Sequence, residues 1–168
     1  VSTGSIYTRF GDKAGLFSAV VKPAADGLME LYLESITAAR ESGDPAEATS
    51  QGNEGTELVL KYIYENFDVF KLIFCHSAGT EYEHYFDELA ETEEKYYREF
   101  VKQFSRRENM VSDFFIHVIC RTGWSYIYEV VSHDLSYDEA QIFMKSIREF
   151  CFAGWGKVLG QNYEDLGL

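Results

Sequence analysis

Hydrophobic side chains recur every three or four residues along almost the whole chain, which is the spacing that places them on one face of an α-helix. The pattern predicts a short helix within the first ten residues and longer helices over about 13–42, 45–65, 68–76, 81–106, 113–132 and 137–159. No strand-like alternation of apolar and polar positions stands out. The sequence therefore predicts an all-α fold.

Residues that favour helix ends support several of these boundaries. Side chains that can cap a first turn stand before four of the predicted helices, at Asp12, Asp44, Ser112 and Ser136. Gly79 and Gly160 stand where helices are expected to end. Pro23 predicts a kink or a break in the first long helix, because proline lacks the amide that an interior position donates. The polar, glycine-rich segment 50–55 leaves open whether the helix continues through it.

The composition adds a surplus of aromatic residues and a strongly acidic balance. Aromatic residues make up 16% of the 168 residues, which suits a cavity or a large interface as well as a core. The net charge of −13 disfavours nucleic-acid binding by the molecule as a whole. Residues 1–22 nevertheless carry Arg9, Lys13 and Lys22 against Asp12, a charge of +2, which leaves −15 for the rest. Any contact with DNA is therefore confined to the amino-terminal end.

The first residues have the side chains that a helix in a DNA major groove requires. Small and hydroxyl residues that can cap the helix and allow close approach of its backbone come first, namely Ser2, Thr3, Gly4 and Ser5. With Ile6 and Phe10 facing inward, three polar side chains are left facing outward, those of Tyr7, Thr8 and Arg9. Lys13 at the next helix start can bind a phosphate. By spacing alone, an ordinary capped surface helix accounts for the same pattern.

The string Val-Ser-x-Gly-x-Ile-Tyr-x-x-Phe-x-x-Lys-x-x-Leu-Phe resembles the recognition helix and the following helix start of the TetR family of bacterial transcriptional regulators. The resemblance is carried by Val1, Ser2, Gly4, Ile6, Tyr7, Phe10, Lys13, Leu16 and Phe17. This motif covers about a tenth of the chain. Beyond it, the resemblance lies in the number and order of helices and in an aromatic final helix with Phe150, Ala153 and Gly154.

The resemblance implies a helix-turn-helix DNA-binding domain followed by a helical-bundle domain that binds an effector and forms a homodimer. Residues 1–22 would then be the remnant of the first domain and residues 23–168 the second. The residues on the DNA side would be Ser2, Thr3, Gly4, Ser5, Tyr7, Thr8, Arg9 and Lys13. The two helices that brace the recognition helix in the family are expected before Val1, and Pro23 departs from the pattern of the connecting helix.

A stripe of polar-tipped residues on the predicted helix 113–132 marks the candidate ligand site. His117, Arg121, Trp124 and Tyr128 follow one another at spacings of four, three and four. Arg121 can pair with an anionic effector on which the two aromatic rings stack, and an internal ion pair is the alternative. Other walls are expected from Phe74, His76, Tyr82, Tyr85, Phe86 and Tyr96, each of which can also be ordinary core. The ligand expected is a small aromatic or anionic molecule.

The last predicted helix carries a broad apolar stripe with small residues near its end. It consists of Ile142, Phe143, Ile147, Phe150, Ala153, Gly154 and Val158. Burial within one subunit explains such a stripe, because any core-facing helix has one. The family resemblance favours instead a two-fold interface in which two copies contribute two helices each.

Other kinds of site have little support. Glu81-x-x-His84 is half of a di-iron pattern without a second copy, and Asp113 with His117 lacks a third ligand, so no metal and no cofactor is predicted. No phosphate-binding loop or nucleophile elbow occurs, which disfavours an enzyme.

Charges interrupt the longest apolar run, so no membrane span is expected. Buried thiols in a reducing cytoplasm are expected at Cys75, Cys120 and Cys151.

These patterns favour a ligand-responsive DNA-binding regulator, a repressor that a small effector releases from its operator. The alternative is a helical carrier that binds a small apolar molecule and makes no contact with DNA. A helical metalloenzyme is a third hypothesis, which metal analysis of the purified protein decides.

Overall fold

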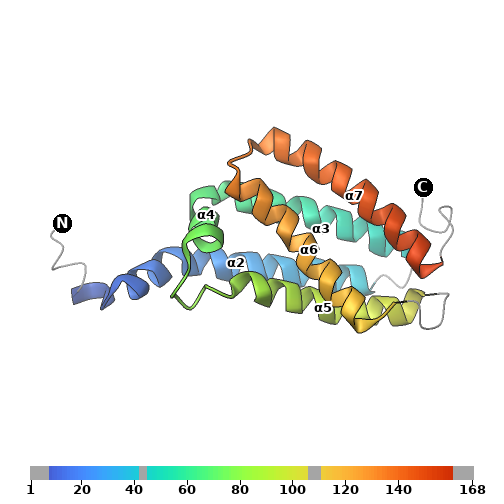
Figure 1. Cartoon of the computed structure of the whole chain (residues 1–168), viewed down its shortest axis with the longest axis horizontal. Helices are drawn as coiled ribbons and strands as arrows, with labels where there is room; N and C mark the ends of the chain where they lie inside the picture. The colour runs from blue at the N-terminus through green and yellow to red at the C-terminus, as the bar shows by residue number, and fades with distance from the viewer. Residues whose placement is uncertain (1–7, 42–44, 106–110, 161–168) are drawn as a thin grey trace.

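The computed structural model describes residues 8–41, 45–105 and 111–160. Its helices are α2 (Lys13–Glu41), α3 (Pro45–Glu65), α4 (Phe67–His76), α5 (Tyr85–Phe104), α6 (Asp113–Ser132) and α7 (Tyr137–Leu159) (Figure 1). Residues 8–10 are also helical, and no strand occurs in these ranges. The predicted all-α fold is confirmed.

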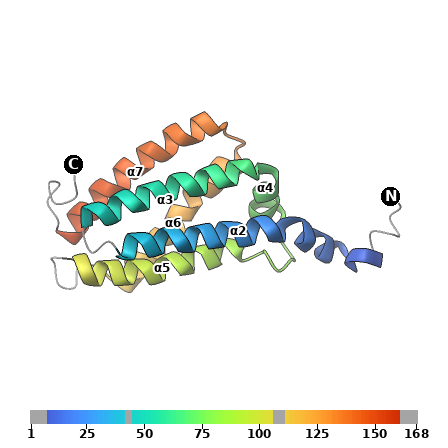
Figure 2. The ribbon, with the colours of Figure 1, turned by 180° about the vertical axis from the view of Figure 1, so that it is seen from behind.

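The helices form an elongated bundle from which one end of α2 projects (Figures 1 and 2). The most extensive packing joins α2 to α3 and α5 to α6. The short helix α4 packs against both α2 and α6 near the end from which α2 projects, and α7 lies against α3. The start of α2 therefore extends beyond the body of the bundle.

Local capping explains where several helices begin and end. The Gly15 amide donates to Asp12 Oδ1 (2.8 Å) at the start of α2, and the Ser112 hydroxyl accepts from an amide in the first turn of α6. Ser136 forms a capping box with the third residue of α7, and Gly160 ends that helix with a φ of 71°. These predicted ends are confirmed. The predicted cap at position 44 lies outside the described residues.

Of the two alternatives predicted at Pro23, a kink or a break, the break is wrong, because α2 continues through Pro23 from Lys13 to Glu41. Pro23 is exposed, so water can reach the Ala19 carbonyl that the missing amide leaves without its helical partner. Figure 1 shows that the helix changes direction in its amino-terminal half and does not end there. The predicted boundary between residues 22 and 23 thus lies inside one helix. α3 likewise continues through the segment 50–55.

α5 starts at Tyr85, four residues later than predicted. The residues before it form turns, in which Gly79 has a φ of 77°. The Thr80 hydroxyl donates to the Ser77 carbonyl (2.7 Å) and accepts from the Tyr82 amide (3.2 Å). Because these local hydrogen bonds satisfy the backbone outside a helix, the periodic pattern of hydrophobic residues overestimated the length of α5.

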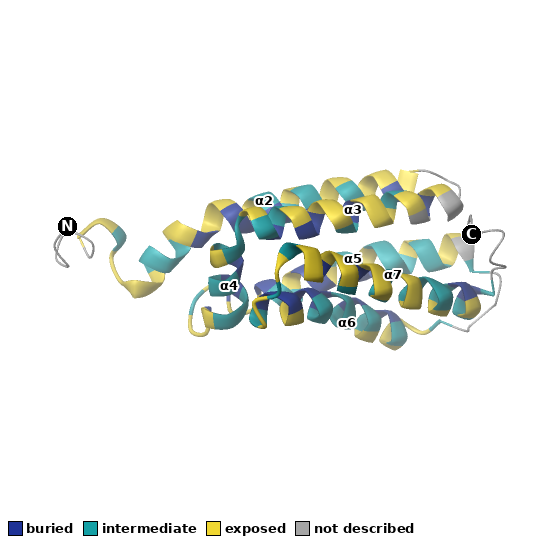
Figure 3. Cartoon of the chain, turned by 90° about the horizontal axis from the view of Figure 1, so that it is seen from above, coloured by how far each residue is buried: buried dark blue, intermediate teal, exposed yellow. Residues whose placement is uncertain are grey.

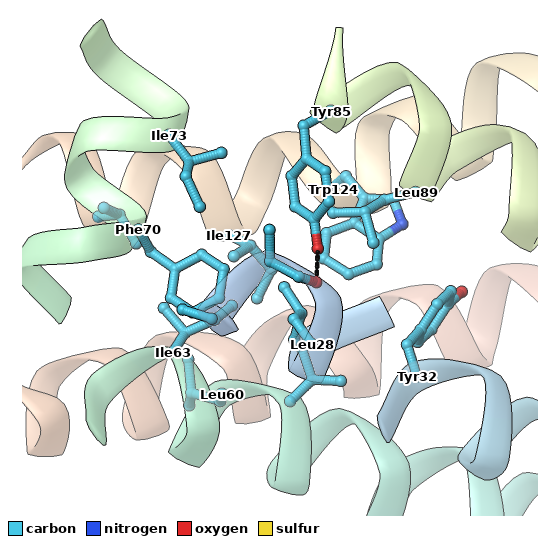
Figure 4. Close-up of a cluster of buried hydrophobic side chains, with 14 of the residues drawn as sticks. Leu28, Tyr32, Leu60, Ile63, Phe70, Ile73, Tyr85, Leu89, Trp124 and Ile127 are labelled. Carbon is cyan, nitrogen blue, oxygen red and sulfur yellow. Dashed lines mark hydrogen bonds between the residues drawn. The ribbon is translucent and has the colours of Figure 1, made fainter. Parts of the chain in front are cut away.

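The core lies where α2, α3, α4, α5 and α6 meet (Figures 3 and 4). Its buried side chains include Leu28, Ile63, Phe70, Ile73, Leu89 and Ile127. The Tyr85 hydroxyl donates to the Ala25 carbonyl (2.6 Å, dashed in Figure 4), which joins α5 to α2 inside the core. This packing holds α4 and α6 in the positions that form the cavity described below.

Candidate functional site

The amino-terminal arm, defined here as residues 8–17, projects from the bundle (Figure 1), and Phe17 at its end packs against the core. The side chains of Thr8, Arg9 and Lys13 are exposed, as a binding role requires. Phe10 is half-buried, and the Arg9 guanidinium carbon lies 5.3 Å from the centre of its ring. The other residues predicted to contact DNA lie outside the described residues, and they are Ser2, Thr3, Gly4, Ser5 and Tyr7.

Two glycines set the direction of the chain within the arm. Gly11 has a φ of 78°, a left-handed conformation that side chains disfavour. A Cβ atom at Gly15 would lie 2.1 Å from the carbonyl oxygen of Phe10, so any larger residue would force the backbone to move. The first turn of α2 therefore packs closely under the preceding residues and fixes where Lys13 lies relative to Phe10.

A partly open cavity of about 270 Å³ lies between α4, α5, α6 and residues 77–84, which we call the 77–84 segment. It is lined by Ile73, Phe74, Ser77, Tyr82, Glu83, Phe86, Ser125 and Tyr128. The rings of Phe74 and Phe86 meet edge to face with their centres 6.4 Å apart and form one wall. Four of the predicted ligand residues are brought together here: Phe74, Tyr82, Phe86 and Tyr128.

The other predicted ligand residues do not line this cavity, and they are His76, Tyr85, Tyr96, His117, Arg121 and Trp124. His76 is exposed at the end of α4, whereas Tyr85 and Trp124 are buried in the core. The Trp124 ring meets the Tyr32 ring edge to face, 5.1 Å between centres. Tyr96 packs with the rings of its neighbours on α5. Most of these aromatic residues therefore serve packing.

The polar stripe of α6 pairs with acidic residues of α5. Arg121 forms an ion pair with Asp87, the internal alternative considered from the sequence. His117 Nδ1 lies 2.7 Å from Oε1 of Glu94, which is only 5% exposed, and Arg98 lies 2.8 Å from its other oxygen. The guanidinium of Arg121 is thus engaged within the protein, and the cavity gains no cation from it.

Glu93 on α5 is a half-buried acid with a buried carboxyl oxygen, and the sequence analysis missed it. Its Oε2 and the Trp124 Nε1 are both buried without a hydrogen-bond partner in the described part of the chain. Burial raises the pKa of the Glu93 carboxyl to about 8, although the nearby Tyr32 hydroxyl and Trp124 indole oppose this rise. The sequence could have indicated this burial, because Glu93 lies four residues from both Leu89 and Tyr97 and so shares the apolar face of the helix with them.

Large apolar side chains are exposed on α6 and α7, which lie on the same side of the bundle (Figures 1 and 3). These residues are Phe114, Val118 and Tyr128 on α6 and Ile142 and Phe150 on α7. Within the predicted dimer stripe, Ile142 and Phe150 are 70% and 71% exposed. Gly154 is exposed as well, and the other members are half-buried, namely Phe143, Ile147, Ala153 and Val158. α6 is therefore not covered by other helices on all of its sides.

The 77–84 segment connects the cavity with the projecting end of α2. Tyr82 lines the cavity, and its ring centre lies 6.2 Å from that of Phe17 in the arm. One residue further along α2, the Ser18 hydroxyl donates to the Glu81 carboxylate. A molecule that displaced this segment from inside the cavity would therefore act on the start of α2.

No protein-family model, curated protein or solved structure matches this chain. Function is therefore inferred from the arm, the cavity and the exposed helix faces.

None of the helices in the described ranges has the length and apolarity that a membrane crossing demands. Cys120 is buried, Cys75 and Cys151 are half-buried, and all three are free thiols.

Proposed function

We propose that the protein is a ligand-responsive, dimeric DNA-binding regulator similar to the TetR family, and that it represses transcription until a small molecule binds. The position of the cavity beside the arm is the observation that carries this proposal. Tyr82 forms a wall of the cavity and packs on Phe17, four residues after Lys13. Residues 1–22 would contact DNA, and residues 23–168 would bind the ligand and the second copy.

The mechanism that this arrangement supports is a population shift. A ligand in the cavity favours the position of the 77–84 segment that leaves room for the ligand. Because this segment contacts the start of α2, the ligand also favours one direction of that part of the helix. In a dimer, two recognition helices must enter major grooves about one helical turn apart. A change in the direction of α2 alters this spacing and weakens binding to the operator.

Replacement of Lys13 by Ala in the full-length protein is expected to weaken binding to DNA selected from a random pool by the wild type. Lys13 is exposed at the projecting end of α2, where its charge can neutralise a phosphate. Loss of one such contact lowers affinity for all sequences and reduces the slope of log affinity against log salt by about 1. Fluorescence anisotropy at several salt concentrations measures both quantities.

Lys61→Ala is the control, because Lys61 is also an exposed lysine but lies on α3, outside the arm, where it pairs with Glu65 (3.8 Å). Equal affinities of the Lys13 and Lys61 variants would contradict DNA contact through the arm. A wild-type protein that selects no DNA but still binds small molecules would favour the carrier function instead.

Phe150→Glu is expected to convert a dimer to a monomer at micromolar concentration. Phe150 is 71% exposed, and burial of such a ring at the centre of an interface contributes about 2 kcal/mol or more. The dimer dissociation constant should therefore rise at least about 30-fold in sedimentation equilibrium. Leu58→Glu on α3, 49% exposed, is the control and should leave the dimer intact. A wild-type monomer would refute the two-fold arrangement.

A further inference from the structure

The cavity is walled by aromatic rings and is small. Phe74 and Phe86 meet edge to face on one side, and Tyr82 and Tyr128 add their rings. Its volume of about 270 Å³ suits a molecule with a single ring better than a large polycyclic compound. Aromatic faces attract both other rings and cations, because their π-systems are negative at the face.

The charge around the cavity favours a positive ligand. Among its lining residues Glu83 alone is charged, and it is exposed at the rim. Three cations on the packed helices form ion pairs within the protein: Arg121 with Asp87, Lys71 with Asp134, and Lys22 with Asp26. A chain that carries −15 beyond residue 22 adds a field of the same sign. The expectation of an anionic ligand, which rested on Arg121, has no support from these residues.

Hydrogen-bond acceptors are also available to a ligand in the cavity. The Ser125 hydroxyl donates to the Arg121 carbonyl (2.8 Å), which leaves its own oxygen free to accept. Glu83 accepts the Gly79 amide on Oε2 (3.0 Å), and a carboxylate has further lone pairs to offer. A group that donates several hydrogen bonds and bears a positive charge satisfies both residues.

We infer that this cavity takes a small aromatic ammonium compound, with its ring among Phe74, Phe86 and Tyr128 and its protonated amine toward Glu83 and Ser125. The inference rests on the proposed function only in making this compound class the effector. As a binding site, it depends on the cavity alone.

Three probes with the same ring and a short side chain separate the contributions of ring and charge. Phenethylamine is a cation at neutral pH, phenethyl alcohol is neutral, and phenylacetate is an anion. In titrations of the full-length protein without DNA, followed by calorimetry, the amine should bind at least about 10-fold more tightly than the alcohol. Phenylacetate should bind at least about 10-fold more weakly than the alcohol.

Glu83→Gln tests the charge, because an amide oxygen can still accept the Gly79 amide while the negative charge is lost. This variant should reduce the preference for amine over alcohol to less than about 3-fold. Glu91→Gln removes an exposed charge on the adjoining helix α5, outside the cavity lining, and should leave the preference unchanged. Ser125→Leu fills the cavity and should weaken binding of amine and alcohol alike, with circular dichroism confirming that the variant folds.

Equal or tighter binding of phenylacetate would overturn the inference, as would a wild-type protein that binds none of the three probes. Unchanged amine binding by Ser125→Leu would place the site elsewhere and overturn it too. Failure of DNA binding is a separate result: a protein that binds the amine but no DNA refutes the regulator and leaves this site intact.

Discussion

Replacement of Phe70 by Ala is expected to lower the free energy of unfolding by about 3–5 kcal/mol. Phe70 is fully buried on α4 (Figure 4). Its ring centre lies 6.0 Å from that of Tyr62 on α3 and 5.7 Å from that of Phe74. Removal of the ring deletes apolar burial and leaves a void that helices already packed against one another cannot close. Because Phe74 is a cavity wall, ligand binding should weaken as well.

Urea denaturation followed by circular dichroism measures the loss as a lower midpoint at an unchanged slope. Leu58→Ala is the control, because Leu58 is 49% exposed on α3 and should cost less than about 1 kcal/mol. A loss below about 1 kcal/mol for Phe70→Ala would show that α4 does not pack into the core as described.

The helix ends that the sequence predicted correctly are those determined by neighbouring residues. Asp12, Ser112 and Ser136 each bond to amides within the next three residues, so the residue type and its place before an apolar run suffice. The sequence could not decide between a kink and a break at Pro23, because the effect of the proline depends on its exposure, which tertiary packing decides. The start of α5 was misjudged because the Thr80 hydrogen bonds compete with a helix that the periodicity also allows.

In the candidate site, too, the sequence predicted what neighbouring residues determine but not what tertiary packing determines. The aromatic surplus suited a cavity or a large interface, and four of the predicted ligand residues line the cavity, namely Phe74, Tyr82, Phe86 and Tyr128. Spacing on α6 could not separate Tyr128, which faces the cavity, from Arg121, which faces Asp87, because that choice depends on how α5 packs beside α6. A single sequence contains the helix faces but not the pairing between them.

The second prediction concerns Glu93, the half-buried acid whose Oε2 atom is buried between α2, α5 and α6. Its pKa is about 8 in the folded protein, against 4.5 for an ordinary glutamic acid. Between these values the folded protein keeps a proton that the unfolded chain has lost. Stability is therefore greatest below about pH 4.5 for this group, falls by up to about 1.4 kcal/mol per pH unit through this window, and levels off above pH 8.

The groups that face Glu93 do not change charge in this window. Burial raises the pKa of Tyr32 on α2, of Tyr97 on α5, of Cys120 on α6 and of Cys151 on α7, so all four stay neutral up to pH 8. Glu139, whose carboxylate accepts hydrogen bonds from Ser136 in the capping box of α7, has a lowered pKa. Its contribution to stability has the opposite pH dependence to that of Glu93, because it is lost as the pH falls. That contribution is common to the wild type and a Glu93 variant and cancels in their difference.

Glu93→Gln keeps the shape of the side chain and removes its ionisation. The variant should become more stable than the wild type as the pH rises, with the difference growing by about 1 kcal/mol per unit between pH 5 and 8 and then remaining constant. Urea denaturation at pH 5, 6, 7, 8 and 9 measures this difference, and Glu91→Gln, at an exposed position on the same helix, should show no such trend. A pH-independent difference would mean that Glu93 ionises normally. Its carboxyl would then have to reach water, and the packing of α2 and α6 against α5 around it would have to be looser than described.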